Sequence, residues 1–255
     1  MTQPGSSAVV TGDALATMKT LGSGTARLVL TSPPYNIGKA YERRVPLEDY
    51  LEGQRAVIRE AARIVVEGGS VCWQVGNFVE DGEVIPLDSM MIPLMREAGL
   101  KIRNRIVWSF GHGQHCRRRM SGRHETIVWA TCGDGHHFDL DPIRVPQTYP
   151  RKRAYKGARK GMLSGHPLGK NPGDVWQIPN IKFNHPEKTA HPCQFPEALA
   201  ERLVSALTME GDLVIDPYAG SGTTGAVCSR LARRSLLIEI DPAYAEIARA
   251  RIAAP

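Results

Sequence analysis

Two short stretches of the sequence carry polar groups at spacings that suit chemistry. The first is TSPPYN, residues 31–36, which directly follows the apolar run ARLVL. Each proline fixes its φ angle, donates no backbone hydrogen bond and pushes the preceding residue out of helical conformation, so the stretch predicts a rigid corner at a strand end. Taken alone, the corner is explained by termination of the strand. A polyproline ligand explains it less well, because the PxxP pattern is absent.

The second stretch is DPYAGSGTTGA, residues 216–226, which lies between a predicted strand and a predicted helix. Backbone N–H groups and the helix dipole at such a turn face a ligand. Gly220, Gly222 and Gly225 satisfy GxGxxG, and Glu239 ends the next predicted strand at an offset that suits a ribose hydroxyl. No lysine follows the last glycine, which excludes a Walker A loop. The stretch therefore predicts a site for an adenosine-containing cofactor.

The position of this turn in the chain argues against NAD or FAD. A dinucleotide site normally opens its fold and is followed by a second mononucleotide-binding half, whereas here only about thirty residues remain after Gly225. The sheet must therefore be completed by strands upstream. That arrangement brings TSPPYN to the same carboxyl edge of the sheet as the glycine turn, where ligands bind in such folds.

The elements that must position both stretches alternate between strand and helix patterns. Strands are predicted at 26–30, 70–76, 101–110, 125–132, 212–217 and 235–241, and helices at 47–69, 86–98, 195–207, 224–234 and 243–253. Such alternation predicts an α/β fold with a mostly parallel sheet and helices on both faces.

Residues 133–186 break this pattern. Proline, glycine and basic residues dominate the stretch, and it is too long for an ordinary loop in a compact domain. We expect it to be a small inserted domain or a segment that becomes ordered on a partner, so that 1–132 and 187–255 together form the main domain.

Basic residues gather in two clusters within a net charge of +6. Residues 151–170 contain seven lysines or arginines and no acid, with Tyr155 interleaved, and the stretch CRRRMSGR, residues 116–123, holds four arginines. Such clusters are often solvated surface, but their density also suits a phosphate backbone, where counterion release drives binding. Nucleic acid is the favoured partner.

The remaining composition limits the cellular setting. The five cysteines are scattered without CxxC spacing, which favours reduced thiols, and no His or Cys pair has the short spacing typical of zinc sites. No apolar run is long enough to cross a bilayer, and a secretory signal pattern is absent at the start. We expect a cytoplasmic protein with no membrane association and no metal.

Together the motifs resemble those of the S-adenosylmethionine-dependent DNA amino-methyltransferases, specifically the permuted beta group in which the catalytic motif precedes the cofactor motif. TSPPY (31–35) is similar to their [DNS]PP[YFW] motif and DPYAGSGTT (216–224) to their cofactor loop. Secondary likenesses at GDAL (12–15), GGSVCWQVG (68–76), RHETIVWA (123–130) and KTAHPCQFP (188–196) extend the resemblance over nearly the whole chain. It implies a Rossmann-like methyltransferase fold with permuted motif order and an inserted target-recognition region at 133–186.

The resemblance also implies roles for individual residues. Catalysis is expected from Ser32, Pro33, Pro34 and Tyr35. S-adenosyl-L-methionine is expected to contact Asp13 at its adenine, Glu239 at its ribose, Asp216, Gly220 and Gly222 at its methionine end, and Tyr218, Ala219, Ser221, Thr223, Lys188, His191 and Pro192 along the pocket. Double-stranded DNA is expected to contact Arg117, Arg118, Arg119, Arg123, Arg151, Lys152, Arg153, Lys156, Arg159 and Lys160.

The implied chemistry gives the proline corner a purpose. With the base flipped out of the duplex, the Ser32 hydroxyl and the Pro33 carbonyl accept hydrogen bonds from the exocyclic amino group, and the Tyr35 ring stacks on the base for about 1–3 kcal/mol. Methyl transfer is then a direct displacement without a covalent enzyme intermediate. Pro192, Cys193 and Gln194 match the PCQ tripeptide of carbon-5 cytosine methyltransferases, but that family places it after the cofactor loop, so Cys193 is expected to line a pocket or the core.

Within the family, serine at the Ser32 position accompanies cytosine N4 methylation, whereas aspartate accompanies adenine N6 methylation. We therefore expect N4-methylcytosine in duplex DNA, with N6-methyladenine as the alternative. An NAD-dependent oxidoreductase, a nucleic-acid-binding protein without catalysis, and RNA or protein methylation stay open. A cognate restriction endonuclease is a candidate partner, and the chain is expected to act as a monomer or homodimer.

Overall fold

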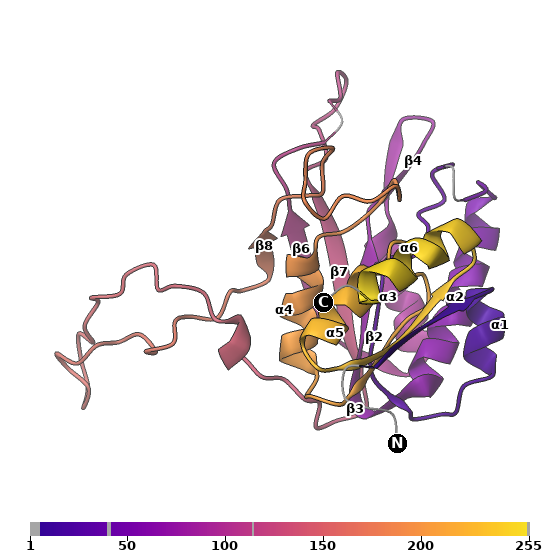
Figure 1. The fold of residues 1–255 in the computed structure, drawn as a ribbon. Helices are drawn as coiled ribbons and strands as arrows, with labels where there is room; N and C mark the ends of the chain where they lie inside the picture. The colour runs from indigo at the N-terminus through magenta and orange to yellow at the C-terminus, as the bar shows by residue number, and fades with distance from the viewer. Residues whose placement is uncertain (1–5, 40–41, 114, 254–255) are drawn as a thin grey trace.

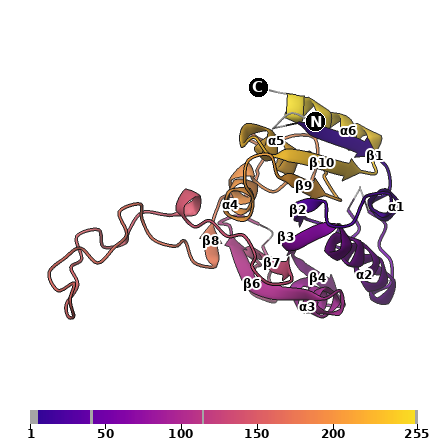
Figure 2. The same cartoon turned by 90° about the horizontal axis from the view of Figure 1, so that it is seen from below.

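The computed structural model describes residues 6–39, 42–113 and 115–253, and in this part of the chain an eight-stranded sheet carries helices on both faces (Figures 1 and 2). The strand order is β1-β10-β9-β2-β3-β7-β6-β8. The strands are β1 (Ser7–Thr11), β2 (Ala26–Thr31), β3 (Val65–Val75), β6 (Leu100–Ser109), β7 (His124–Cys132), β8 (Val175–Gln177), β9 (Leu213–Asp216) and β10 (Arg234–Glu239), and β4 (Asn77–Glu80) pairs separately with β5 (Glu83–Pro86). The helices are α1 (Ala14–Lys19), α2 (Leu47–Ile64), α3 (Leu87–Glu97), α4 (Glu197–Leu207), α5 (Thr223–Arg230) and α6 (Pro242–Ala253), with a 3₁₀ turn at Asp141–Ile143.

The predicted α/β architecture is confirmed, including the mostly parallel sheet. Strands β1, β10, β9, β2 and β3 are parallel to one another, and β8 is parallel to β6. Within the described sheet, only β7 runs against its two neighbours, β3 and β6. The carboxyl ends of β2, β9 and β10 therefore meet at one edge, which we call the active edge. The amino end of β7 reaches the same edge because β7 is antiparallel to β3.

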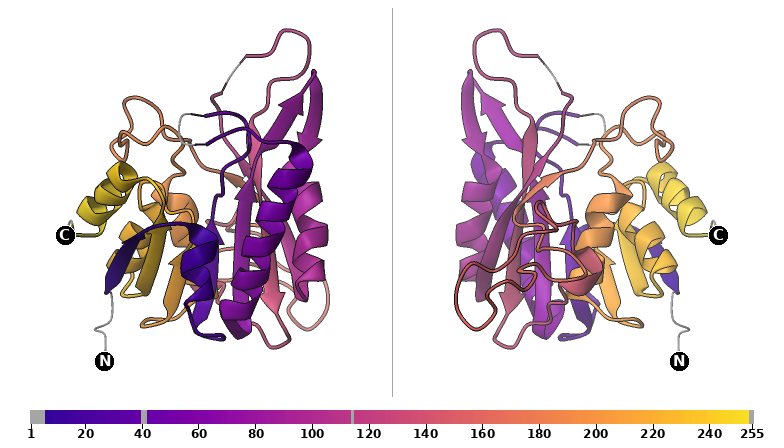
Figure 3. Two further views of the ribbon diagram at one scale, coloured as in Figure 1. Left: turned by 90° about the vertical axis from the view of Figure 1, so that its right-hand side faces the viewer. Right: turned by 90° about the vertical axis from the view of Figure 1, so that its left-hand side faces the viewer.

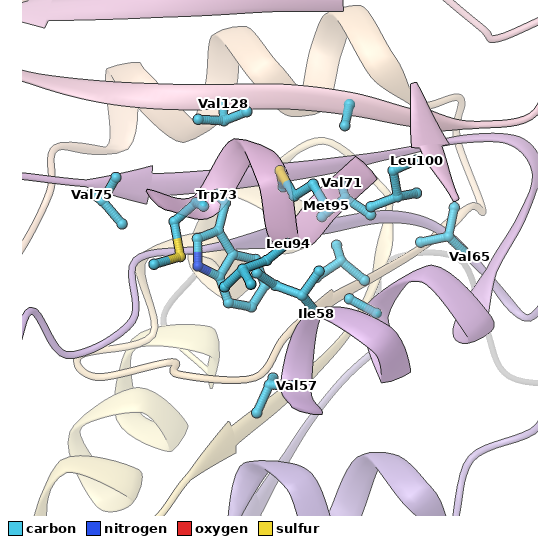
Figure 4. Packing of buried hydrophobic residues seen from close by; sticks show 14 of the residues in the cluster. Val57, Ile58, Val65, Val71, Trp73, Val75, Leu94, Met95, Leu100 and Val128 are labelled. Atoms are coloured by element: carbon cyan, nitrogen blue, oxygen red, sulfur yellow. The ribbon is translucent and has the colours of Figure 1, made fainter. Parts of the chain in front are cut away.

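Three hydrophobic clusters hold the helices against the sheet. One joins α1, α2 and α3 to one face, another joins α4 and α5 to the opposite face, and a small third cluster joins α6 to β10. In the first cluster Trp73 of β3 is fully buried among Ile58, Leu94 and Met95 (Figure 4), and its indole N–H donates to the Gln54 side chain over 3.1 Å. The buried indole is thus both packed and hydrogen-bonded, as a polar group in a core requires.

Several local features differ from expectation. The helix predicted over 47–69 ends at Ile64, and its last five residues, VVEGG, begin β3 instead. Their apolar positions fit helical spacing, but pairing with β2 makes them extended. Ala26 lies opposite Val65 and Leu28 opposite Ser70, so the extra residues of β3 form a bulge. The short elements α1, β1 and β8 and the β4–β5 hairpin were not predicted either, because each is too brief to show a clear periodicity.

The inserted stretch 133–186 consists of two anchored ends and a free arm. Ile143, Trp176 and Ile178 are buried against α4 and β6. Residues 144–174 extend away from the β8 side of the sheet as an arm (Figures 1 and 2). Two isolated bridges, Val145 with Lys170 and Arg153 with Leu163, hold its two sides together. No residue of the arm, all of which is described, belongs to the hydrophobic clusters of the main body.

The helices of the described ranges include none that is both long and apolar enough to span a bilayer.

Gly222 immediately precedes α5 and packs against Ala248 of α6. Its φ of 78° is left-handed, and a Cβ there would lie 2.8 Å from Cα and Cβ of Ala248. We expect Gly222→Ala to lower the free energy of unfolding by about 2–4 kcal/mol, which combines backbone strain with overpacking. Urea unfolding measures this loss.

The matched control is Gly24→Ala, because Gly24 has a similar φ of 61° but no atom within 4 Å of its Cβ position. It carries the backbone strain alone, and we expect a loss of about 1 kcal/mol. Equal losses in the two variants would show that contact with α6 does not restrict position 222.

Candidate active site

A buried carboxylate joins the two motif stretches at the active edge. Asp216, 1% exposed at the end of β9, accepts hydrogen bonds from the Thr31 hydroxyl and the Thr224 hydroxyl, both over 2.6 Å. The Tyr218 N–H donates to the same carboxylate over 3.2 Å. Burial is the main cause that raises the pKa of Asp216 to about 6. The TSPPYN corner and the glycine turn are therefore fixed side by side, as the sequence predicts.

A cavity of about 500 Å³ lies over this junction. Its walls come from the segment that leads into α1, the proline corner, β3, the loops that flank β6 and β7, the segment 180–195 and the glycine turn. The lining includes Gly12, Asp13, Ser32, Pro33, Pro34, Tyr35, Lys39, Gln74, Trp108, Phe110, Glu125, Asn180, His191, Pro192, Cys193, Tyr218, Ala219, Gly220, Ser221, Thr223 and Glu239. Both motif stretches thus face one chamber of the size that small-molecule sites have.

Glu239 shapes the glycine turn from the end of β10. Its carboxylate accepts hydrogen bonds from the Gly220 N–H over 2.8 Å and the Asp241 N–H over 2.9 Å. Burial raises its pKa, and the side chain lines the cavity. The two carboxylate oxygens retain lone pairs that a pair of vicinal hydroxyls could occupy.

His191 closes the cavity beside the glycine turn. Its ring packs edge-on against Tyr244, with ring centroids 4.6 Å apart, and a Cβ on Gly220 would come within 3.1 Å of it. Burial lowers the pKa of His191 to about 4, so the ring is neutral at pH 7. A neutral ring lets a cationic ligand approach without charge repulsion.

Four side chains form a hydrogen-bonded network on the opposite wall. Oη of Tyr35 lies 2.9 Å from Oγ of Ser32 and donates to Glu125 over 3.0 Å. The Gln74 amide donates to the same Glu125 oxygen over 2.8 Å. Gly76 leaves room for the Tyr35 ring, because a Cβ there would lie 3.1 Å from it. The network fixes both the ring and the hydroxyl of the proline corner.

A family comparison identifies the chain. Residues 26–250 match the model of a family described as DNA methylase, N6_N4_Mtase. The chain belongs to this family of DNA methylases. S-adenosyl-L-methionine is accordingly its cofactor.

Individual relatives agree with this family over nearly the full chain. The chain is 46% identical over 241 residues to the type II methyltransferase M.BglII of Bacillus subtilis, covering 94% of this chain and 67% of that protein. It is 31% identical over 249 residues to the DNA adenine methyltransferase YhdJ of Escherichia coli K12, covering 96% and 82%.

Two solved structures share the architecture. The DNA modification methylase TTHA0409 of Thermus thermophilus, complexed with S-adenosyl-L-methionine, matches with a TM-score of 0.68 at 27% identity, over 96% of this chain and 92% of that one. The cytosine-N4-specific PvuII DNA methyltransferase matches with a TM-score of 0.78 at 20% identity, over 99% and 89%. The second likeness shows the methyltransferase fold alone.

The cavity of this DNA methylase fits its cofactor. A carboxylate lies at the end of β10 where the sequence predicts a ribose contact, the glycine turn has no side chain at Gly220, and His191 is neutral beside it. Glu239, Asp13 and the 218–223 turn would hold the molecule. No group of three or more His, Cys, Asp or Glu among the described residues could hold a metal ion.

The cavity includes most of the residues that the sequence singled out. All four predicted catalytic residues line it, as do Asp13, Tyr218, Ala219, Gly220, Ser221, Thr223, Glu239, His191 and Pro192. Asp216, Gly222 and Lys188 are not among the residues that line it. Asp216 holds two hydroxyls, Gly222 packs on α6, and the Lys188 ammonium donates to the carbonyl of His191 over 2.5 Å. We therefore expect these three to support the cofactor indirectly.

The basic residues fall into two separate places. Arg117, Arg118 and Arg119 are exposed on the loop between β6 and β7, which lies at the active edge (Figure 3). Arg123 is half-buried at the end of that loop. The others, Arg151, Lys152, Arg153, Lys156, Arg159 and Lys160, are exposed on the arm.

Three site residues were missed by sequence reasoning. Glu125 and Gln74 meet Tyr35 only through the pairing of β7 with β3, although both lie in stretches that resemble family motifs. Arg251 of α6 donates to the Ser221 carbonyl over 3.1 Å, to the Thr223 hydroxyl over 2.9 Å and to Glu197 over 2.6 Å. Its contacts join residues far apart in the chain, and no local pattern signals them.

The raised pKa of Asp216 makes a prediction about stability. Because the folded state binds this proton more tightly than the unfolded chain, the group favours folding at low pH, and that contribution is lost as pH rises through about 6. The quantity to follow is the difference in free energy of unfolding between the parent protein and Asp216→Asn. We expect this difference to fall by roughly 1 kcal/mol as the pH rises from 5 to 8. Urea unfolding across this range measures it.

The surface acid Glu210 supplies the control, because it is exposed and does not line the cavity. The same difference taken for Glu210→Gln should stay flat with pH. A flat difference for Asp216→Asn as well would mean that Asp216 is not the group that titrates near pH 6.

Proposed function

We propose that this DNA methylase transfers the methyl group of S-adenosylmethionine to the exocyclic amino nitrogen of a flipped base in a specific duplex sequence, and that the base is cytosine. The observation that carries the proposal is the shared cavity: Ser32 and Tyr35 line the same chamber as Gly220 and Glu239. The acceptor groups of the proline corner thus face the place where the cofactor would lie.

The chemistry follows from the side chains around the base. An exocyclic amino nitrogen is a poor nucleophile because its lone pair is delocalised into the ring. Hydrogen bonds from the two amino hydrogens to the Ser32 hydroxyl and the Pro33 carbonyl would concentrate that lone pair on nitrogen. The bound cofactor supplies an electrophilic methyl group on a sulfonium. Positioning of both reactants in one chamber then lowers the barrier without a covalent enzyme intermediate.

The choice of base rests on Ser32. In the family that the motifs resemble, serine at this position accompanies cytosine. Adenine is the second candidate, because a relative 31% identical to this chain is named a DNA adenine methyltransferase. A neutral hydroxyl accepts a hydrogen bond from the amino group of either base. A type II relative also suggests a restriction-modification setting, in which a cognate nuclease would cut the same unmethylated sequence.

DNA contact is proposed for both basic clusters. Arg117, Arg118 and Arg119 belong to the loop between β6 and β7 at the active edge (Figure 3), and Phe110 of the same loop lines the cavity. The phosphates around a flipped base would pass along this loop. The arm, 144–174, carries the second cluster on the β8 side (Figure 1). We propose that the arm contacts DNA away from the flipped base and contributes to target recognition.

Analysis of the methylated base tests the proposed reaction. With mixed-sequence duplex DNA and labelled S-adenosylmethionine, we expect N4-methylcytosine after hydrolysis of the product. N6-methyladenine would instead establish the adenine alternative. Ser32→Ala should lower the transfer rate by about 100-fold or more while leaving the cofactor Kd unchanged by calorimetry. Parallel loss of cofactor binding would mean that Ser32 has a structural role.

Salt dependence tests the arm. We expect the double variant Lys156→Gln/Lys160→Gln to reduce the slope of log affinity against log salt by about 0.9 for each phosphate contact removed. The charge-matched control is Lys19→Gln/Arg96→Gln, which changes two exposed residues of α1 and α3. The same slope in both variants would show that Lys156 and Lys160 of the arm do not contact DNA phosphates.

A further inference from the structure

The wall of the cavity contains an acid to which the proposed reaction has so far given no role. Glu125 lies near the start of β7 at the active edge and lines the cavity together with Ser32 and Tyr35. One of its oxygens, Oε2, accepts hydrogen bonds from the Tyr35 hydroxyl and the Gln74 amide. No other acid takes part in this network of four described side chains. The network therefore ends on a single group that can take up a proton.

The direction of the hydrogen bonds follows from counting protons. An ionised Glu125 has none to give, so Tyr35 must use its one hydroxyl proton toward Glu125, as the 3.0 Å contact indicates. The Ser32 hydroxyl must then donate its proton to Tyr35 Oη across the 2.9 Å contact. Ser32 is left with lone pairs and no proton toward the cavity, so it can only accept from a ligand there.

A continuous chain of hydrogen bonds therefore runs from Ser32 at the cavity, through Tyr35, to Glu125. We propose that Glu125 is the final acceptor of the proton that the target amino group sheds, and that Ser32 and Tyr35 relay it. The inference rests on the proposed amino-methyl transfer and adds to it the destination of the proton. The neutral Gln74 holds the acceptor oxygen in place from β3.

The step balances in atoms and charge. The amino lone pair forms the bond from nitrogen to the methyl carbon, and the carbon–sulfur bond breaks with its electron pair staying on sulfur, which becomes a neutral thioether. One N–H proton moves to Ser32 Oγ as the Ser32 proton moves to Tyr35 Oη and the Tyr35 proton to Glu125. A sulfonium and a carboxylate are consumed, and a thioether, a carboxylic acid and a methylated amine result.

Burial suits both ends of the relay. It raises the pKa of Glu125, which makes this carboxylate a stronger base than an exposed glutamate. It also raises the pKa of Tyr35, so the phenol keeps its proton between turnovers. Tyr35 donates to Glu125, and the charge of His124 on β7 acts on it. The other titratable groups of the cavity lining are Asp13, Lys39, His191, Cys193, Tyr218 and Glu239. The β3 and β6 neighbours, Gln74 and Trp108, carry no charge.

The alternative is that Glu125 only orients Tyr35. Glu125→Gln separates the two roles, because the amide oxygen still accepts from the Tyr35 hydroxyl but takes up no proton at neutral pH. Orientation alone predicts near-normal transfer in this variant. A proton acceptor predicts a loss of about 100-fold in the single-turnover rate, within the range of general base catalysis.

The experiment measures single-turnover methyl transfer from preformed complexes with duplex DNA over acid to alkaline pH. For the parent protein we expect the rate to fall toward acid pH as Glu125 takes up its proton before the reaction. Glu125→Gln should be slow and lose this acid limb, whereas Glu125→Asp should be slowed but keep it. Tyr35→Phe retains the ring and cuts the relay, so it should also lose the limb. Glu210→Gln, an exposed acid, should match the parent protein.

Cofactor calorimetry and thermal unfolding accompany each variant, so that a folding defect is recognised. Transfer by Glu125→Gln within about threefold of the parent protein, well short of a general-base loss, or an unchanged acid limb in that variant, would overturn the relay and leave the proposed function standing. Absence of transfer to any DNA base by the parent protein would instead overturn the proposed function.

Discussion

The active edge depends on one buried carboxylate, that of Asp216, which joins an N-terminal strand to the C-terminal glycine turn. Asp216 receives one hydroxyl from β2 and one from α5, each over 2.6 Å, and these residues are 185 and 8 positions away in sequence. Burying an acid in this way is costly, which is why its pKa rises, and three neutral donors offset much of the cost. Because Thr31 immediately precedes Ser32, this contact fixes the proline corner relative to the glycine turn. Both stretches line the cavity.

Charge is separated between the cavity and the outer surface. Glu239 and Glu125 take their hydrogen bonds from neutral N–H and O–H groups, and within the described ranges neither forms an ion pair. The chamber therefore holds two carboxylates without an ion-pair partner, which favours a sulfonium cation. Outside it, a net charge of +6 and the two basic clusters favour a polyanion. One chain thus attracts a cationic cofactor and an anionic substrate to adjacent places.

Features that were predictable from the sequence are those with a local cause. The proline corner, the glycine turn and the alternation of strands and helices each follow from neighbouring residues, and a strand order that brings the two motifs together follows from the position of the turn near the chain end. The VVEGG segment was misassigned because its apolar spacing fits a helix and only pairing with β2 makes it a strand. Glu125 and Arg251 escaped notice because their partners are tertiary neighbours. The hydroxyl partners of Asp216 could not be predicted either, because its motif gives no sign of which atoms the carboxylate faces.

The arm is separate from the packed body that carries the cavity. Residues 144–174 add nothing to the hydrophobic clusters, while the residues on either side, Ile143 and Trp176, are anchored in the core. The sheet and the cavity are thus complete without the arm, and its sequence is free of packing constraints that would act on a buried segment. If the arm contacts DNA as proposed, changes in it would alter which DNA is bound without disturbing the Asp216 junction. Under that proposal one catalytic body is compatible with different target sequences, provided that the two anchors at β8 and the 3₁₀ turn remain.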